Sequence, residues 1–143
     1  MKPYVTEYRV IYADCDPFDV MYYANYLTLF ERGRTELFRS MGLAYREISE
    51  RGIYTPVTEA HCNYFKSVRY DDLLLIETSI GLLKKASIRI EHEIYRKEPR
   101  TLLARGYTVL AFVNRDVKIQ PVPPDVVEKV RQLLDEEDAV QRQ

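Results

Sequence analysis

The chain has 143 residues, of which 46% are apolar and 30% charged, and its formal net charge is −1. A chain of this length predicts one domain, residues 1–143, that buries about two-thirds of its unfolded surface. The balanced charge excludes a global attraction for nucleic acid or an anionic membrane, and the lack of a long apolar window predicts a cytoplasmic protein without a membrane partner.

The first third of the chain changes from a strand pattern to a helix pattern. Tyr4 to Tyr12 alternates polar and apolar side chains, which predicts a strand that Pro17 would stop. From about Tyr23 to Met41 apolar residues recur every three or four positions, which predicts a helix with Gly42 as its C′ residue. Gly33 lies on the apolar face of this helix, and a close approach by neighbouring backbone would explain it.

The rest of the chain predicts a sheet between two helices. In chain order we expect a short helix at Leu43–Arg51, strands at Val57–Lys66, Asp72–Leu83, Ser87–Arg96 and Thr101–Asn114, and a helix at Pro124–Asp138. The connections at 84–86 and 97–100 are too short for helical crossovers and predict antiparallel hairpins. One long helix against an antiparallel sheet predicts an α+β arrangement.

Two carboxylates stand where the first strand meets the long helix. Asp14 and Asp16 precede the predicted helix start, where unpaired backbone N–H groups and the helix dipole stabilise negative charge. A carboxylate there could attack a carbonyl or activate water while the amides hold a developing oxyanion. The alternative is that Asp16 and Asp19 only cap the helix, as aspartate commonly does.

The chain does not predict a metal site. A calcium loop that starts at Asp14 needs glycine at its sixth position and glutamate at its twelfth, and the chain has Asp19 and Asn25 there. His61 and Cys62 are neighbours in a predicted strand, so their side chains point to opposite faces and cannot share one ion.

Both cysteines are expected to be free thiols. A single disulfide would be an unusual staple for a domain with a full core, which predicts that Cys15 and Cys62 stay reduced. Cys15 lies between two aspartates that would raise the pKa of its thiol, and no adjacent histidine could act as its base. A cysteine nucleophile is therefore not expected.

The segment from Asp14 to Tyr26 reads DCDPFDVMYYANY, and Phe30 to Arg34 reads FERGR. These motifs resemble the 4-hydroxybenzoyl-CoA thioesterase family, whose signature is Asp-x-Asp after the first strand, an aromatic-rich helix start and a Glu-x-x-Arg helix. The resemblance implies a hotdog fold, in which a curved antiparallel sheet wraps a long central helix. It also implies hydrolysis of an acyl-CoA to a carboxylic acid and coenzyme A, no metal or redox cofactor, and a homodimer or homotetramer whose sheets join edge to edge.

The resemblance also implies roles for individual residues. Asp16 matches the catalytic carboxylate, which acts as nucleophile or general base. Tyr23 occupies the helix-start position whose backbone N–H polarises the thioester carbonyl. Lys84 and Lys85 match a basic turn that contacts coenzyme A phosphates, and Ser87 follows where the hydroxybenzoyl enzyme also has serine. Without the resemblance, two adjacent lysines are more often a solvated hairpin.

Several positions depart from the family's pattern. Asp19 replaces a usual glycine between the catalytic carboxylate and the helix, which would change the turn or add a negative charge near the site. Tyr23 stands where many bacterial relatives have histidine, and Ala86 shortens the basic run of the hydroxybenzoyl enzyme. Arg69 is a further candidate for a phosphate contact. Aromatic residues that would suit an aromatic or short aliphatic acyl pocket are Tyr22, Tyr23, Tyr26, Tyr64 and Phe65.

Two other functions are compatible with the sequence. One is a hotdog module that binds acyl-CoA or acyl-carrier protein without hydrolysis, for which Asp19 in place of glycine is the main argument. The other is a dehydratase or hydratase, which would need a histidine and a carboxylate facing the thioester. The chain's histidines are His61 and His92. His92 lies among isoleucines and is expected in the core with one hydrogen-bonded partner, and Glu59 is expected to face solvent.

Overall fold

The computed structural model describes residues 1–141, with side chains described to residue 135. Within this range five strands form one antiparallel sheet in the order β1-β3-β4-β5-β2. The strands are β1 Tyr4–Arg9, β2 Val57–Tyr64, β3 Leu73–Leu83, β4 Ser87–Arg96 and β5 Thr101–Ala111, and the helices are α1 Asn25–Ser40, α2 Tyr45–Glu50 and α3 Pro124–Gln141. No helix of this range is both long enough and apolar enough to cross a lipid bilayer.

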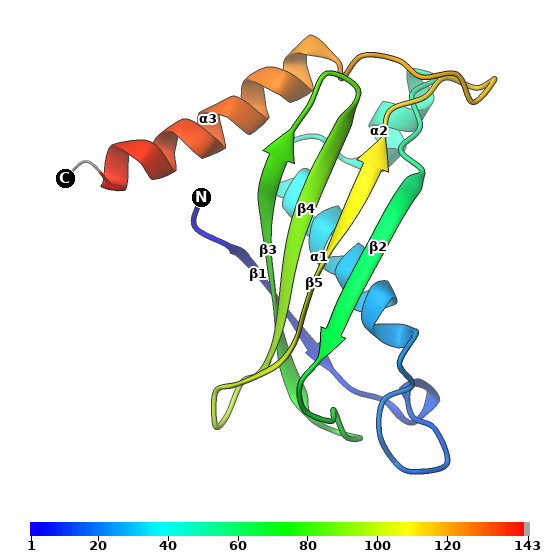
Figure 1. Cartoon of the computed structure of the whole chain (residues 1–143), viewed down its shortest axis with the longest axis vertical. Helices are drawn as coiled ribbons and strands as arrows, with labels where there is room; N and C mark the ends of the chain where they lie inside the picture. The colour runs from blue at the N-terminus through cyan, green and yellow to red at the C-terminus, as the bar shows by residue number, and fades with distance from the viewer. Residues whose placement is uncertain (142–143) are drawn as a thin grey trace.

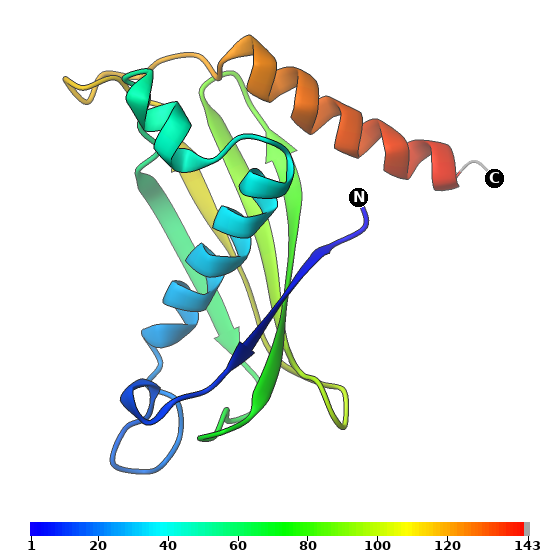
Figure 2. The same cartoon turned by 180° about the vertical axis from the view of Figure 1, so that it is seen from behind.

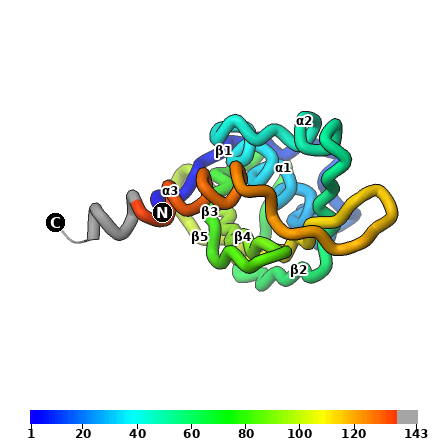
Figure 3. The backbone as a smooth tube through the Cα atoms, turned by 90° about the horizontal axis from the view of Figure 1, so that it is seen from above, coloured from blue at the N-terminus to red at the C-terminus, as the bar shows by residue number. Residues whose placement is uncertain are grey.

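The sheet curves around α1. Figures 1 and 2 show α1 lying across one face of the sheet, and Figure 3 shows the strands arranged around it from β1 to β2. On β4 the residues that face α1, such as Ile90 and Ile94, are completely buried, while the residues between them stay partly exposed. The predicted α+β fold with a curved sheet around a central helix is confirmed.

The register defines two ends of the sheet. At the hairpin end, one row joins Val57, Leu110, Ile88 and Leu83 across four strands. At the loop end, another row joins Tyr64, Ala104, Ile94 and Ile76. The 84–86 hairpin follows the first row, and the loops at 10–22 and 65–72 lie beside the second. Because β3 rises about 3.3 Å per residue, the two rows are about 23 Å apart, and the hairpin and the loop before Leu73 lie about 35 Å apart along the strand.

The first strand is shorter than predicted. β1 ends at Arg9, and Tyr12–Asp14 forms a 3₁₀ turn, although the alternation of side chains continues to Tyr12. The Asp14 carboxylate explains the turn, because its Oδ2 accepts hydrogen bonds from the Ile11 N–H (3.0 Å) and the Tyr8 hydroxyl (2.7 Å). The prediction that Pro17 stops the strand is therefore wrong.

Other boundaries shift by a few residues. β2 ends at Tyr64 rather than Lys66, because the N–H groups of Phe65 and Lys66 both turn to the Leu103 carbonyl. β5 ends at Ala111 rather than Asn114, because Val113 forms isolated bridges with Tyr54 and Ile119. The other boundary differences are a start of β3 at Leu73, α2 at Tyr45–Glu50 instead of Leu43–Arg51, and a backbone of α3 that continues to Gln141. The strand at Ser87–Arg96 and both antiparallel hairpins are confirmed.

β2 is an edge strand with two open faces. Seven of its eight residues are exposed, and Cys62 is the partly buried exception. On β1, the other edge, exposed and half-buried residues alternate instead. The difference arises because α1 packs mainly on β3 and β1 and reaches β2 only weakly. β2 therefore offers both an unpaired backbone edge and an uncovered inner face.

Gly33 lets α1 approach the sheet closely, as its position in the sequence predicted. The neighbours are side chains rather than backbone, because a Cβ atom at Gly33 would overlap Thr78 Oγ1 and lie 2.8 Å from Ile76 Cγ2. Both belong to the inner face of β3 and are completely buried. A side chain at this point of α1 would push the helix away from the sheet.

We expect the Gly33→Ala variant to be less stable than wild type by about 1–3 kcal/mol, because overpacking of the helix–sheet contact outweighs the higher helix propensity of alanine. Urea unfolding measures the change. Thr28→Ala, on the exposed side of the same helix, is the control and should be neutral or slightly stabilising. Equal stability of Gly33→Ala and wild type would contradict the close approach.

Candidate active site

The loop that carries Asp16 is fastened from two sides. Cys15 and Met21 form an antiparallel bridge, and Val20 forms another with Arg69. The Met21 N–H also donates to the Val68 carbonyl at 2.7 Å. The loop is thus closed on itself and attached to the segment that leads into β3, which fixes its backbone at the loop end of the sheet.

The carboxylate of Asp16 has one bound and one open oxygen. Its Oδ1 accepts hydrogen bonds from the N–H groups of Phe18 (2.8 Å) and Val20 (3.5 Å). Oδ2 accepts none from the backbone of residues 1–141 or from the side chains of residues 1–135. Asp16 is half-buried and lines a cleft. The two amides hold the carboxylate in place and leave one oxygen available for chemistry.

Asp19 adopts the backbone conformation that a glycine would supply. Its φ is +64°, in the left-handed region, which aspartate tolerates better than most residues. Its N–H donates to the Asp16 carbonyl at 3.0 Å, and its side chain is exposed. The replacement of the usual glycine therefore keeps the turn and adds a negative charge outside the cleft, since Asp19 is absent from the cleft lining.

The backbone before α1 presents an unpaired donor. α1 begins at Asn25, so Tyr23 precedes the helix rather than opening it, and the sequence-based helix start is wrong by two residues. The Tyr22 carbonyl accepts from the Asn25 N–H at 2.9 Å. Because the N–H and C=O of a trans peptide point in opposite directions, the Tyr23 N–H points away from the helix. It has no acceptor in the backbone of residues 1–141 or in the side chains up to residue 135.

Asp14 holds the backbone on both sides of Tyr23 in place. Its carbonyl accepts from the Tyr22 N–H (2.9 Å) and from the Asn25 side-chain amide (2.8 Å). Its carboxylate shapes the preceding turn, and burial together with the hydrogen bond to that carboxylate raises the pKa of Tyr8 to about 12. Asp14 is therefore a structural residue, although the sequence placed it with Asp16 as a candidate for acid chemistry.

The cleft beside Asp16 has a volume of about 340 Å³. It is lined by Asp16, Val20, Met21, Tyr23, Tyr26, Tyr64, Phe65, Lys66 and Ser67. Four of the five aromatic residues suggested by the sequence lie in this wall, and Tyr22 does not. The cleft is thus lined by a residue with an open carboxylate oxygen, a residue with an unpaired backbone N–H and an aromatic wall, which suits attack on a polarised carbonyl.

The predicted phosphate-binding residues lie at the other end of the molecule. Lys84, Lys85 and Ser87 belong to the hairpin between β3 and β4, about 35 Å from the loop end along β3. The hairpin borders a separate hollow of about 600 Å³, whose apolar wall includes Val122 and Val127 of the α3 region. Within one chain the structure does not bring these residues to Asp16.

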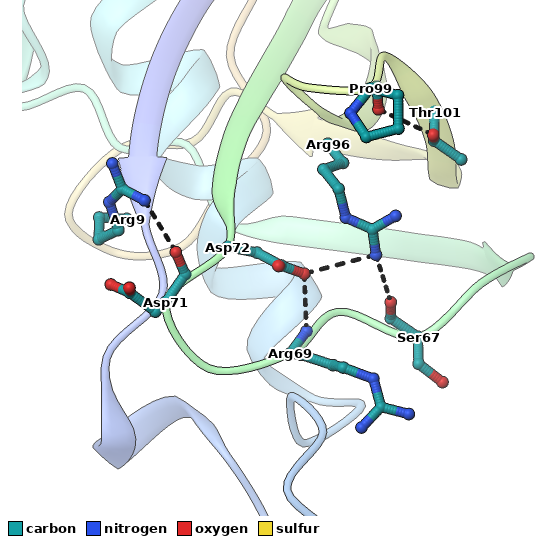
Figure 4. Close-up of polar contacts among 8 residues, drawn as sticks. All are labelled: Arg9, Ser67, Arg69, Asp71, Asp72, Arg96, Pro99 and Thr101. Carbon is teal, nitrogen blue, oxygen red and sulfur yellow. Dashed lines mark hydrogen bonds and ion pairs between the residues drawn. The ribbon is translucent and has the colours of Figure 1, made fainter.

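Three arginines, Arg9, Arg69 and Arg96, lie around the turn at residues 69–72 (Figure 4). This turn is attached to the Asp16 loop by the bridge between Val20 and Arg69. Asp72 accepts from the Arg69 N–H at 2.9 Å and lies 3.5 Å from the Arg96 guanidinium, while Arg9 donates to the Asp71 carbonyl at 2.8 Å. The guanidinium of Arg69 takes part in none of these contacts. The phosphate role suggested for Arg69 stays a prediction.

Neither cysteine is activated. Both thiols are free, as predicted. Burial, followed by the charges of Asp19, Asp14 and Asp16, raises the pKa of Cys15, and burial raises the pKa of Cys62. Among the residues whose side chains are described, no group of three or more histidine, cysteine, aspartate or glutamate residues could hold a metal ion.

The two histidines lie outside the cleft. His61 is exposed on the outer face of β2 and stacks on Tyr107 at 5.4 Å between ring centroids. His92 is completely buried, stacks on Phe30 at 4.3 Å, and its Nε2 lies 2.9 Å from Thr108 Oγ1. The prediction of a core histidine with one partner is confirmed. Neither ring faces Asp16, so a histidine–carboxylate pair for hydration is not formed.

Sequence reasoning missed residues that shape the site through contacts distant in the chain. The Tyr64 hydroxyl donates to the Tyr23 carbonyl at 2.9 Å across 41 positions, and no local pattern could have indicated this bond. The role of Asn25 could have been inferred, because asparagine is common at helix starts and follows an aromatic run here. Tyr8 gave no signal beyond its place in a strand.

Comparison with known proteins places the chain in a family. The sequence profile of the Thioesterase-like superfamily matches residues 10–130. An acyl-CoA thioesterase of Haemophilus influenzae is 32% identical over 115 residues, which cover 80% of this chain and 82% of the relative. The 4-hydroxybenzoyl-CoA thioesterase of Pseudomonas sp. (strain CBS-3) is 29% identical over 84% of this chain and 92% of its own. The chain therefore belongs to the Thioesterase-like superfamily.

Solved structures agree with this assignment. The chain is similar to the DHNA-CoA thioesterase of Staphylococcus aureus, with a TM-score of 0.91 and 27% identity over 97% of this chain and 95% of that one. It is also similar to a substituted 4-hydroxybenzoyl-CoA thioesterase in complex with 4-hydroxybenzoyl-CoA, with a TM-score of 0.83 and 26% identity over 91% and 99% of the two chains. The hotdog fold is confirmed.

Burial of His92 should make stability sensitive to mild acid. Burial, with the nearby Arg34 charge, lowers the pKa of His92 from its ordinary 6.5 to about 3. The unfolded chain then binds a proton below pH 6.5 that the folded chain does not, so stability falls as pH drops from 6.5 towards 3. We expect the titration of His92 to lower the free energy of unfolding by about 2 kcal/mol between pH 7.5 and pH 5.

The measurement is urea unfolding at both pH values for wild type, His92→Gln and the exposed control His61→Gln. His92→Gln should lose about 2 kcal/mol less than wild type on acidification, and His61→Gln should follow wild type. Identical pH dependence in all three proteins would contradict a neutral buried His92.

Proposed function

We propose that this protein is an acyl-CoA thioesterase with its reaction centre in the Asp16 cleft. The observation that carries the proposal is that one cleft is lined by both Asp16, which has an open carboxylate oxygen, and Tyr23, whose N–H is unpaired. Asp16 acts on the thioester carbonyl carbon, directly or through water, and the Tyr23 N–H stabilises the oxyanion. Water supplies the new C–O bond, the C–S bond breaks, and coenzyme A leaves as the thiol.

Each part of the site has a separate task in this reaction. The amides of Phe18 and Val20 hold Asp16 so that its open oxygen keeps one direction. Lys66 supplies a positive charge in the cleft wall. The chemistry uses a carboxylate and a backbone amide, so we expect no metal or redox cofactor. We expect the enzyme to act in the cytoplasm, where its two free thiols remain reduced.

Membership of the superfamily and the relatives that carry acyl-CoA thioesterase names support this reaction class. The aromatic wall formed by Tyr23, Tyr26, Tyr64 and Phe65 favours an aromatic or short acyl group. The solved relatives named for DHNA-CoA and 4-hydroxybenzoyl-CoA are consistent with the aromatic choice.

The two alternative functions gain no support from particular residues. The non-hydrolytic binding module depended on Asp19, and Asp19 preserves the turn that glycine would make. The hydratase depended on a histidine beside the carboxylate, and His92 is a core residue while His61 lies on the outer face of the sheet. Hydrolysis is therefore the function that the cleft supports best.

We also propose that two chains pair through β2. An antiparallel β2–β2 contact would satisfy the open backbone edge and cover the inner face that α1 leaves exposed. A two-fold axis near Ala60 and His61 would place the hairpin end of one chain beside the loop end of the other. A tetramer would then form from two such dimers.

This pairing would resolve the separation of the predicted site residues. Lys84 and Lys85 of one protomer would lie at the same end of the joint sheet as Asp16 of its partner. A hollow of about 620 Å³ that includes Tyr54 and Pro56, just before β2, would then border the partner's cleft. The coenzyme A phosphates would meet the lysines of one chain while the thioester meets Asp16 of the other.

The reaction is tested by thiol release from a panel of aromatic, short and long aliphatic acyl-CoAs. Asp16→Asn should lower kcat by about 10²–10³-fold or more, because it removes the nucleophile or base while keeping the shape. The matched control is Asp19→Asn, which removes a carboxylate from the same loop and keeps a residue that tolerates positive φ. Equal loss in both variants, or none in Asp16→Asn, would sink the assignment.

The dimer is tested by sedimentation. Ala60→Asp puts like charges near each other across the proposed axis and should shift the protein to monomer, with activity lost in parallel. Val5→Asp, on the exposed side of the other edge strand, should leave the assembly unchanged. A wild-type protein that sediments as an active monomer would contradict the β2 pairing.

A further inference from the structure

The Tyr23 carbonyl lies just before the helix and accepts a hydrogen bond from none of the helix N–H groups. The first N–H groups of α1 are directed elsewhere, because Asn25 donates to the Tyr22 carbonyl (2.9 Å) and Leu27 to the Ala24 carbonyl (3.2 Å). In the described part of the chain, with side chains to residue 135, the hydroxyl of Tyr64 is the sole donor to the Tyr23 carbonyl, at 2.9 Å. Tyr64 is the last residue of β2.

The Tyr64 ring is held in position independently of that hydrogen bond. It meets the ring of Tyr26 edge-on, with 4.7 Å between centroids, and Tyr26 is itself 96% buried in the core. Both rings line the cleft with Asp16. The Tyr64 ring, which is 47% exposed, thus rests on a core aromatic and carries its hydroxyl to a single backbone acceptor.

The two peptide groups around Tyr23 are fixed from opposite sides. The peptide before it is held by the helix, through the bond from Asn25 to the Tyr22 carbonyl. The peptide after it is held by the sheet, through Tyr64. The Tyr23 N–H lies in the first of these planes, and φ and ψ of Tyr23 couple that plane to the second, so a fixed second plane limits how far the N–H can turn.

From this geometry we propose that Tyr64 is a positioning residue for thioester hydrolysis: its hydroxyl fixes the peptide after Tyr23 and thereby aims the Tyr23 N–H at the substrate oxyanion. The inference rests on the proposed function, since it assigns a purpose to the same site. Tyr64 donates to backbone rather than to substrate, so its contribution lies in the placement of a donor that acts in the transition state.

The hydrogen bond persists over the working pH range of an enzyme. Burial and the neighbouring Cys62 raise the pKa of Tyr64 to about 12. The hydroxyl therefore keeps its proton and remains a donor near neutral pH. The pH profile of kcat should have no step that belongs to Tyr64.

The test is Tyr64→Phe, which keeps the ring and its contact with Tyr26 and removes only the hydroxyl. We expect kcat to fall about tenfold with KM changed less than about twofold, because a misplaced donor weakens transition-state binding more than substrate binding. Tyr95→Phe is the matched control: it removes a strand hydroxyl that donates to Glu93 at 3.2 Å, away from the cleft, and should leave both constants unchanged.

A second measurement does not depend on turnover. In nuclear magnetic resonance relaxation, the Tyr23 amide should have an order parameter of about 0.85 in wild type and Tyr95→Phe, and below about 0.6 in Tyr64→Phe. Unchanged kcat or an unchanged Tyr23 order parameter in Tyr64→Phe would overturn the inference. A rise in KM alone would also overturn it, since that result would make Tyr64 a substrate contact.

The proposed function fails separately. If wild type releases no thiol, or Asp16→Asn is fully active, hydrolysis at Asp16 is wrong, while the order parameter still decides whether Tyr64 fixes the Tyr23 backbone. If Asp16→Asn is inactive and Tyr64→Phe behaves like wild type, the function stands and the positioning role is wrong.

Discussion

One helix covers the inner face of a five-stranded sheet, and its limited width shapes the rest of the molecule. Gly33 allows α1 to settle on β3, where Thr78 and Ile76 lie too close for any larger side chain. A helix seated there covers β1 and β3 well and leaves β2 open on both faces. The N-terminal end of the same helix lies beside the cleft that Asp16 lines, since Tyr26 belongs to the cleft wall.

The loop before α1 is organised by one residue that does no chemistry in the proposed reaction. Asp14 binds Tyr8 and Ile11 through its carboxylate, and Tyr22 and Asn25 through its carbonyl. These four contacts join β1, the 3₁₀ turn and the helix start. With the loop so fixed, Asp16 needs only the amides of its own turn to hold its carboxylate. In the proposed reaction, structural and chemical roles are divided between two aspartates two positions apart.

The sequence predicted the elements and the fold class well, because strands and the long helix follow simple periodicity. The strand at Ser87–Arg96 is confirmed residue for residue, since its inner face is fully buried and its hairpins are short. The end of β1 was predicted wrongly, because a single side chain, Asp14, outweighs an alternation that continues to Tyr12. Asp16 and Tyr23 do share a cleft, whereas Lys84 and Lys85 lie at the opposite end, since periodicity carries no information on the distance between two turns. The bond from Tyr64 to Tyr23 depends on long-range packing and was beyond any local pattern.

The distance between the hairpin end and the loop end makes the proposed enzyme sensitive to its own concentration. In the proposed dimer each reaction centre draws on both chains, so dilution below the dissociation constant would remove activity without unfolding either chain. For the same reason, a chain damaged near its lysine turn and a chain damaged at its carboxylate would together contain one complete centre. The extent of pairing through the open edge of β2 would thus determine what fraction of the protein in a cell is active.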